Sequence, residues 1–145
     1  MNVRAARAED VPELAAIAER SYRAAFAGIL EADLLESRNA AFFAGRFAAS
    51  WERMLVAFSN DEPVGFLLMT RDHIDMLFMD PAASGKGGGA VLLKRAEALG
   101  VRSLECFRDN WGARRFYERH GWLADREYER EFAGRNRSFV LCVKR

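Results

Sequence analysis

Hydrophobic residues in the first third of the chain recur at the spacing of an α-helix. Over residues 10–26 the apolar positions fall three or four apart, which predicts an amphipathic helix. Asp10 followed by Glu13 is typical of a capping box, in which each side chain accepts a hydrogen bond from the other's backbone N–H. The same spacing predicts a second helix over residues 32–47, and residues 2–6 suit a short strand before both helices.

Beyond residue 52 the pattern changes to short apolar runs separated by turn residues, which is typical of strands. Residues 53–59 and 64–70 flank a turn at 60–63 and predict a β-hairpin. Pro81 ends the next run, because proline cannot donate a hydrogen bond to a central ladder. The other predicted elements are strands at 73–79, 103–107, 122–132 and 137–144, and helices at 85–99 and 111–120.

The order of these elements predicts an α/β (α+β) fold. A strand–helix–strand unit such as residues 73–107 crosses over with a right hand, which makes its two strands parallel. The hairpins on either side predict antiparallel pairs. Together they predict a mixed, mostly antiparallel sheet of seven strands with helices on both faces.

Composition narrows the class of protein. The 145 residues are 50% hydrophobic and suit one domain over residues 1–145. Lys and Arg total 22 against 21 Asp and Glu, and this balance argues against a general nucleic-acid or membrane binder. Cys106 and Cys142 lack metal-ligand spacing, so we expect no metal site and a reducing, cytoplasmic location. No apolar run approaches the length of a membrane span or a signal segment.

Four glycines in five residues follow the predicted strand at 73–79. The stretch Gly85-Lys86-Gly87-Gly88-Gly89 leads into an apolar helix. Glycine removes the side chains that keep a ligand off the backbone, and a helix N-terminus offers free N–H groups and a positive dipole. The pattern predicts an anion site at residues 85–90, and a glycine-rich connection without a ligand is the alternative.

Two phosphate-binding motifs match this stretch only in part. A P-loop needs a glycine where Asp80 stands and a hydroxyl where Gly87 stands, so it fails at both positions. A dinucleotide fingerprint fits Gly85, Gly87 and Ala90, with Glu105 twenty residues further on. However, five residues separate the predicted strand from its first glycine, and the chain has no second nucleotide-binding half.

A third motif covers more of the chain. Residues 80–93 resemble the acyl-CoA-binding motif of GNAT superfamily N-acetyltransferases, with glycines 85, 87 and 89 at the positions of [QR]-G-x-G-x-[GA]. Ser84 departs from the family by replacing the usual Gln or Arg. Residues 110–122 are similar to the family's second signature, N-x-x-A-x-x-[FL]-Y-x-x-x-G-[FW], with Asn110 and Tyr117 at its asparagine and tyrosine.

The resemblance implies that the two parallel strands splay apart at their C-terminal ends, in the middle of the sheet, and hold coenzyme A between them. Backbone groups of residues 77–79 would bind the pantetheine arm, and backbone N–H groups of residues 85–90 would bind the pyrophosphate. Asn110 would contact the cofactor or hold a helix start. The residues that the resemblance assigns to acetyl-CoA are Leu77, Phe78, Met79, Ser84, Gly85, Lys86, Gly87, Gly88, Gly89, Ala90, Asn110 and Tyr117.

The resemblance also implies direct attack of a primary amine on the thioester, with Tyr117 as general acid. A phenol of ordinary pKa near 10 can protonate a thiolate, although a packed aromatic is the alternative for Tyr117. His73 and Asp75 alternate along one strand and are candidates for the base, Asp75 because burial would raise its pKa; the alternative is a pair at an exposed strand start. The Leu77 N–H is a candidate for the oxyanion contact.

Acceptor recognition falls to the first two helices and the last hairpin in the resembling family. This points to Tyr22 and Phe26, with Asp75 facing the same site, and to Trp51 and Tyr128 as further aromatics. The expected function is transfer of an acetyl group to a small-molecule or protein amine, without nucleic acid or membrane as partner, and a homodimer is compatible with it. The alternatives are a non-catalytic acyl-CoA-binding regulatory module, an interaction domain with a structural loop and, last, a dinucleotide-binding oxidoreductase.

Overall fold

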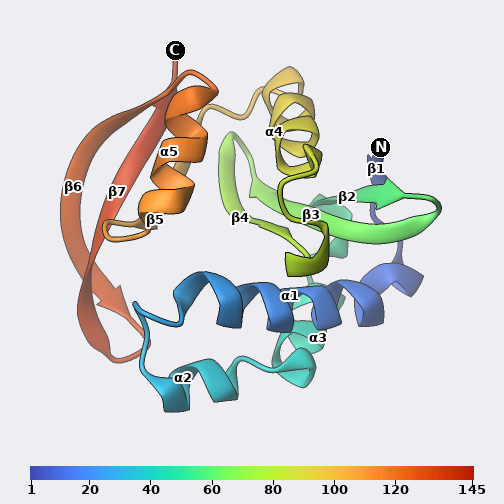
Figure 1. Cartoon of the computed structure of the whole chain (residues 1–145), viewed down its shortest axis with the longest axis horizontal. Helices are drawn as coiled ribbons and strands as arrows, with labels where there is room; N and C mark the ends of the chain where they lie inside the picture. The colour runs from blue at the N-terminus through green and yellow to red at the C-terminus, as the bar shows by residue number, and fades with distance from the viewer.

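The computed structural model describes residues 1–145 and is built around one seven-stranded sheet (Figure 1). The strands lie in the order β1-β2-β3-β4-β5-β7-β6, and only β4 and β5 run parallel. This confirms the predicted mixed, mostly antiparallel sheet. The strands are β1 (Asn2–Ala5), β2 (Met54–Ser59), β3 (Glu62–Thr70), β4 (His73–Met79), β5 (Ser103–Phe107), β6 (Trp122–Phe132) and β7 (Arg135–Lys144).

Helices cover both faces of the sheet, as predicted. The first three lie on one face and the last two on the other (Figure 1). None of them combines the length and the apolar character that crossing a bilayer requires. The helices are α1 (Val11–Phe26), α2 (Ala32–Ser37), α3 (Ala40–Ala48), α4 (Gly88–Ala98) and α5 (Trp111–Arg119), with short 3-10 turns η1 (Ala8–Asp10), η2 (Trp51–Arg53) and η3 (Pro81–Ala83).

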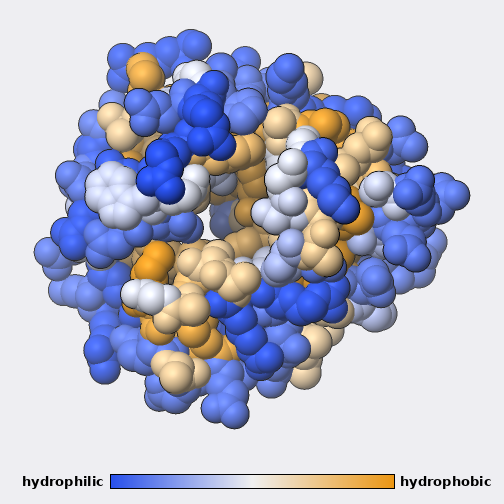
Figure 2. Space-filling view, viewed as in Figure 1, coloured by the Kyte–Doolittle hydropathy of each residue, from blue (hydrophilic) through white to orange (hydrophobic).

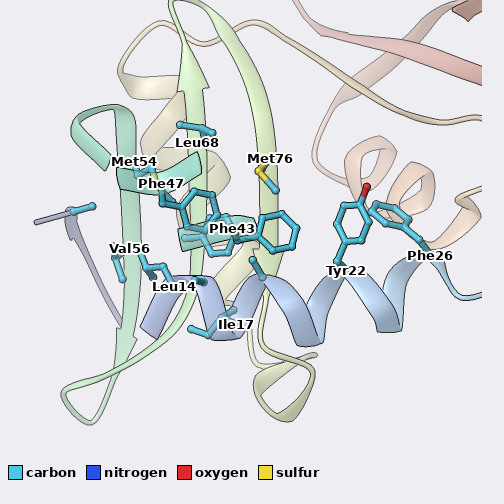
Figure 3. Close-up of a cluster of buried hydrophobic side chains, with 14 of the residues drawn as sticks. Leu14, Ile17, Tyr22, Phe26, Phe43, Phe47, Met54, Val56, Leu68 and Met76 are labelled. Atoms are coloured by element: carbon cyan, nitrogen blue, oxygen red, sulfur yellow. The ribbon is translucent and has the colours of Figure 1, made fainter. Parts of the chain in front are cut away.

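Alternation along the central strands divides the core between the two faces. On β3, Phe66 and Leu68 pack with the α1 side of the core, whereas Leu67 packs with the α4 side. Figure 3 shows the α1 side, where Tyr22 and Phe26 stand near the C-terminal end of the helix, at the edge of the cluster. The apolar core therefore continues to the place where β4 and β5 separate.

The parallel pair β4–β5 is short. Only His73 with Ser103 and Ile74 with Leu104 are in register, and the two strands diverge beyond these pairs. A β-bulge lies at the same point, because Leu68 of β3 faces Met76 while its neighbour Met69 faces Ile74. Asp75 is therefore the extra residue of the bulge, and a bulge bends its strand and disrupts the local ladder. The splayed pair in the middle of the sheet is confirmed.

Both hairpin turns are tighter than predicted. Asn60 and Asp61 have φ of 52° and 64°, and Ala133 and Gly134 have φ of 51° and 85°. Two consecutive positive φ angles are typical of the two-residue type I′ turn that joins twisted antiparallel strands. Consequently β3 begins at Glu62 and β7 at Arg135, each two residues before its predicted start.

The helix predicted over residues 32–47 is two helices. The chain leaves helical geometry at Arg38 (φ −86°, ψ 58°), and the Asn39 side chain accepts a hydrogen bond from the Phe42 N–H at 2.9 Å. Asparagine is among the best N-cap residues, so Asn39 begins α3. The hydrophobic spacing missed the break because side chains of α2 and α3 contact the same core.

The predicted capping box at Asp10 and Glu13 is wrong. The Asp10 carboxylate turns back toward the preceding residues, where Arg4 binds it through two nitrogens at 2.9 and 3.0 Å and the Arg7 N–H donates to it at 2.8 Å. Its side chain is 10% exposed. Hydrogen bonding to the Arg4 guanidinium, and secondarily to the Arg7 backbone, lowers the pKa of Asp10 against the effect of burial. Asp10 therefore ties β1 to the start of α1.

Asp10→Asn is expected to lower the free energy of unfolding by about 1–3 kcal/mol at pH 7, because it removes a charge-assisted pair. A carboxyl whose folded-state pKa is depressed stabilises the fold above its unfolded pKa of about 3.9, and the contribution is lost as pH falls through the folded value. Urea unfolding at pH 7 and pH 3 should therefore show a difference between variant and wild type that shrinks in acid. Glu36→Gln on the exposed side of α2 is the control, and an equal effect of both substitutions would contradict the assignment.

Candidate active site

The divergence of β4 and β5 opens a cavity of about 300 Å³ through the sheet. Figure 2, viewed as in Figure 1, shows a hollow near the centre of the molecule, between α5 and β4 and above α1. Its walls come from both strands, from α1 and α5, and from β6 and β7. The lining residues are Tyr22, Phe26, Arg46, His73, Ile74, Asp75, Met76, Leu77, Phe78, Leu104, Glu105, Cys106, Phe107, Asn110, Ala113, Tyr117, Arg130, Phe132 and Phe139.

We call the gap between the diverging ends of β4 and β5 the wedge. On the side of β4 that faces it, backbone groups have no strand partner. Asp80 donates its N–H to Val64 of β3 at 2.8 Å, so by alternation the backbone groups of Leu77 and Met79 point away from β3 and toward the wedge. The Met79 carbonyl accepts a hydrogen bond from Ser21 Oγ of α1 at 2.9 Å. Leu77 lies in the cavity wall, where β5 is too far away to pair with it. Such groups call for a ligand or water as partner.

The glycine-rich loop presents unpaired backbone donors. None of the N–H groups of residues 85–90 has an acceptor within the protein, and the first to have one is Val91, which donates to Gly87 at 3.2 Å. Gly85 and Gly87 have φ of 81° and 86°, a region that side-chain-bearing residues avoid. The loop ends in the N-terminus of α4, and Lys86 is exposed. This arrangement fits an anionic ligand.

The loop lies beside the cavity rather than in its wall. Of the predicted acetyl-CoA residues, Leu77, Phe78, Asn110 and Tyr117 line the cavity, whereas Met79 and residues 84–90 do not. Met79 is the last residue of β4 and lies between the cavity wall and the loop. A Cβ added at Gly88 would lie 2.2 Å from Met79 Cε. A side chain at position 88 would therefore displace the end of the Met79 side chain, which packs between β4 and the start of α4.

Tyr117 places a protonated phenol in the cavity wall. The ring packs near Trp122 and Phe116 in the α4 side of the core, and the residue is buried. The hydroxyl makes no hydrogen bond within the protein, and since no buried polar side-chain atom is left unpaired, the oxygen is accessible. Burial, with the neighbouring thiols Cys106 and Cys142, raises the pKa of Tyr117 above its ordinary value. The expectation of an ordinary phenol is therefore wrong.

Asn110 acts as a helix cap. Its side-chain oxygen accepts a hydrogen bond from the Ala113 N–H at 3.3 Å, which begins α5. The residue also lines the cavity. Of its two predicted roles the structure contains the helix cap, and by beginning α5 at this point Asn110 fixes the position of Tyr117 two turns later.

The two candidates for the base occupy different environments. His73 Nδ1 lies 2.9 Å from Ser103 Oγ of β5, and its ring lines the cavity. Asp75 is exposed at the bulge, where it accepts a hydrogen bond from Thr70 Oγ1 at 2.5 Å and lies 3.6 Å from Arg53. The predicted burial of Asp75 is wrong, because the bulge turns it outward. The alternative that His73 and Asp75 pair with each other is also wrong.

Glu105 is the cavity residue that sequence reasoning missed. Its carboxylate binds Arg130 Nε at 2.9 Å and accepts a hydrogen bond from the Tyr128 hydroxyl. Desolvation by burial alone would raise the pKa of Glu105, but the hydrogen bonds from Arg130 and Tyr128 and the charge of Arg130 together lower it. Burial and the hydrogen bond to the same carboxylate raise the pKa of Tyr128 to about 12. Glu105 was considered only as the acidic residue of a dinucleotide fingerprint, and its partners lie about 25 residues away on β6.

The predicted acceptor residues meet at the α1 side of the cavity. Tyr22, Phe26 and Asp75 all line the cavity. The ring centroids of Tyr22 and Phe26 are 4.7 Å apart in an edge-on arrangement. Both also belong to the core, so each is a wall as well as a candidate contact. Trp51 packs against the same core but does not line the cavity, and Tyr128 reaches it only through Glu105.

Comparisons with known proteins agree on one family, the GNAT acetyltransferases. A family model described as an acetyltransferase (GNAT) domain matches residues 18–137. Peptidyl-lysine N-acetyltransferase YjaB of Salmonella typhimurium strain LT2 is 33% identical over 99 residues, which are 68% of this chain and 66% of that protein. The match thus spans slightly less than two thirds of that curated relative.

Solved structures of two such proteins share the fold. The solution structure of apo-form YjaB from Escherichia coli has a TM-score of 0.77 and 27% identity, over 98% of this chain and 95% of that one. The PaiA N-acetyltransferase of Thermoplasma acidophilum, solved in complex with coenzyme A, also has a TM-score of 0.77, at 20% identity over 99% and 98% of the two chains.

Proposed function

Because this chain belongs to the GNAT family of acetyltransferases, we propose that it transfers the acetyl group of acetyl-CoA to a primary amine. The observation that carries the proposal is the wedge between β4 and β5, continued by six unpaired N–H groups at residues 85–90. A pantetheine arm has amides that can pair with an unpaired strand edge, and a pyrophosphate suits a row of free backbone donors. One ligand with both parts is coenzyme A.

Acetyl-CoA is proposed to lie across these groups as a surrogate strand. The Leu77 carbonyl and the Met79 N–H would pair with the pantetheine amides, and the loop from Ser84 to Ala90 would bind the pyrophosphate. Ser84 supplies no long side chain to the phosphates, so recognition there rests on the backbone and on the charge of Lys86. This placement brings the thioester toward Tyr117 at the far wall of the cavity.

The proposed chemistry forms a C–N bond and breaks a C–S bond. The substrate ammonium gives up one proton, and the neutral amine then attacks the thioester carbonyl, whose developing oxyanion is met by the Leu77 N–H. Collapse expels the coenzyme A thiolate, and the Tyr117 hydroxyl supplies its proton. The raised pKa of Tyr117 keeps that hydroxyl protonated at neutral pH. The proton of the ammonium passes through His73 to solvent, and the second nitrogen proton, lost as the amide forms, replaces the one that Tyr117 gives to the thiolate.

His73 is the better placed of the predicted proton acceptors. Its ring lies in the cavity wall, and in the proposed tautomer Nδ1–H donates to Ser103 Oγ, so that Nε2 receives the proton of the ammonium. Histidine is suited to proton transfer near neutral pH. Asp75, held by Thr70 and Arg53 at the rim, is proposed to orient the incoming ammonium group rather than to take its proton.

Thiol release tests the proposed function. Acetyl-CoA is mixed with the protein and a panel of primary amines that includes lysine-containing peptides, since the Salmonella relative is named for peptidyl-lysine. Amine-dependent release of coenzyme A is expected, with loss of that release when the amine is replaced by its N-acetyl form. Tight acetyl-CoA binding without release would favour the non-catalytic module, and absence of binding would contradict the proposal. A cytoplasmic location is part of the same proposal.

Gly87→Ala is expected to weaken acetyl-CoA binding by about 10-fold or more. An L-residue at a φ of 86° is strained by about 1–2 kcal/mol, and relief of that strain turns the neighbouring N–H groups away from the pyrophosphate. Isothermal titration measures the dissociation constant. Gly134→Ala has a similar φ of 85° in the distant β6–β7 turn, so it carries the same backbone strain and should leave the affinity unchanged.

A further inference from the structure

One charged side chain in the cavity wall has no partner. Of the four charged residues that line the cavity, Glu105 and Arg130 bind each other, and Asp75 lies beside Arg53. The Arg46 guanidinium makes no ion pair and no hydrogen bond within the protein, whereas its backbone carbonyl accepts hydrogen bonds from Ser50 Oγ at 2.8 Å and from the Ala49 N–H at 3.3 Å. Arg46 is an exposed residue of the cavity lining, so its donors are free to bind a ligand on this side of the cavity.

Two further donors stand beside Arg46. The Tyr22 hydroxyl has no hydrogen-bond acceptor within the protein and opens to the cavity. Burial raises the pKa of Tyr22, while hydrogen bonding to the Arg38 guanidinium and the charges of Arg38 and Arg46 act in the other direction. Arg38 also has no carboxylate partner. Its guanidinium lies over the Phe42 ring at 4.3 Å and 6.0 Å from the Phe132 ring in the cavity wall.

These donors lie on the side of the sheet away from the proposed acetyl-CoA loop. Tyr22 comes from α1 and Arg46 from α3, whereas the loop begins α4 on the opposite face. The opposite sign of charge is available on the same side, at Glu105 and Asp75. The acceptor half of the cavity thus has two carboxylates in one region, and in another the unpaired guanidinium of Arg46, with Arg38 beside Tyr22 just outside the lining.

We propose that the acceptor is a zwitterionic amine whose anionic group, a carboxylate or similar oxyanion, binds Arg46, Arg38 and the Tyr22 hydroxyl while its ammonium faces Glu105 and Asp75. The inference rests on the proposed transfer to an amine and specifies the substrate class. Arginine binds carboxylates through two parallel hydrogen bonds, so the pair of guanidinium groups selects acceptors that carry this group at a suitable distance from the amine.

The test compares acceptors that differ only in the anionic group. The ω-amino acids from glycine to 6-aminohexanoate are measured against the n-alkylamines of equal length, and lysine peptides with glutamate beside the lysine against those with glutamine. For each pair we divide kcat/KM of the acceptor that carries the anionic group by kcat/KM of its neutral counterpart. This acid-to-neutral ratio is expected to exceed about 10 for at least one chain length. Preference within the free amines but not the peptides identifies a small-molecule acceptor, and the reverse identifies a peptide.

Variants connect this preference to the proposed residues. Arg46→Gln is expected to lower the acid-to-neutral ratio by about 10- to 100-fold, chiefly through KM, and Arg38→Gln to lower it less. Arg23→Gln removes an exposed arginine of α1 that pairs with Glu19 outside the cavity, and its ratio should equal that of the wild type. Two results would overturn the inference. One is a wild-type acid-to-neutral ratio near one for both the free amines and the peptides. The other is an equal fall in kcat/KM for the anionic and the neutral acceptor in Arg46→Gln. Absence of thiol release with every amine would instead show that the proposed function itself is wrong, and both proposals would fall.

Discussion

Replacing Tyr117 by phenylalanine is expected to lower kcat about 100- to 1000-fold, while acetyl-CoA binds within about threefold of its wild-type affinity. General acid catalysis contributes at this scale, and phenylalanine preserves the ring that packs against Trp122 and Phe116. Because burial raises the pKa of Tyr117, the wild-type enzyme should also lose no activity from phenol ionisation as pH rises to about 10. Steady-state thiol release and isothermal titration measure the two quantities.

The same variant separates an enzyme from a binding module. A catalytic role predicts that kcat falls while the dissociation constant stays. Tyr128→Phe is the matched control, since it also removes a phenol hydroxyl from the region of the cavity, one that is bound to Glu105. Equal and small effects of the two substitutions would show that Tyr117 is only a packed aromatic.

Phe47→Ala is expected to lower the free energy of unfolding by about 3–5 kcal/mol, because it leaves a cavity in a fully buried core. Phe47 is 0% exposed, and its ring lies 5.7 Å from Phe43 and 5.2 Å from Phe66, so it joins α3 to β3. A loss of this size is a large part of the stability of a small domain. Urea unfolding with linear extrapolation provides the measurement.

Phe42→Ala offers a control on the same helix. Phe42 is 37% exposed, and its contacts include the guanidinium of Arg38 at 4.3 Å. Removing an exposed ring with one cation–π contact should cost about 1 kcal/mol or less. A comparable loss in both variants would contradict the placement of Phe47 at the centre of the core.

The sequence was most informative where chemistry is local. β4 and β5 have the predicted bounds, and Gly85 and Gly87 have the positive φ that only glycine adopts readily. The N–H groups of the loop are unpaired, as a phosphate-binding loop requires. Periodicity, glycine placement and the two spaced motifs were sufficient for these features because each depends on residues close together in the chain.

Features that depend on distant residues could not be predicted. The bulge at Asp75 arises from the register of β4 against β3, and it reverses the side of the strand on which later residues lie. The Glu105–Arg130 pair joins β5 to β6 across β7, so no local pattern indicates it. Asn39 is different, since an N-cap residue in the middle of a predicted helix is a local signal that the apolar spacing concealed.

The central claim is that coenzyme A lies in the wedge between β4 and β5 with its pyrophosphate against residues 85–90. A crystal structure with bound coenzyme A tests it most directly. The account predicts pantetheine amides paired with the backbone of Leu77, the pyrophosphate within hydrogen-bonding distance of the loop N–H groups, and the thiol facing the Tyr117 hydroxyl. A complex in which the wedge is empty and the coenzyme lies on another surface would contradict the account.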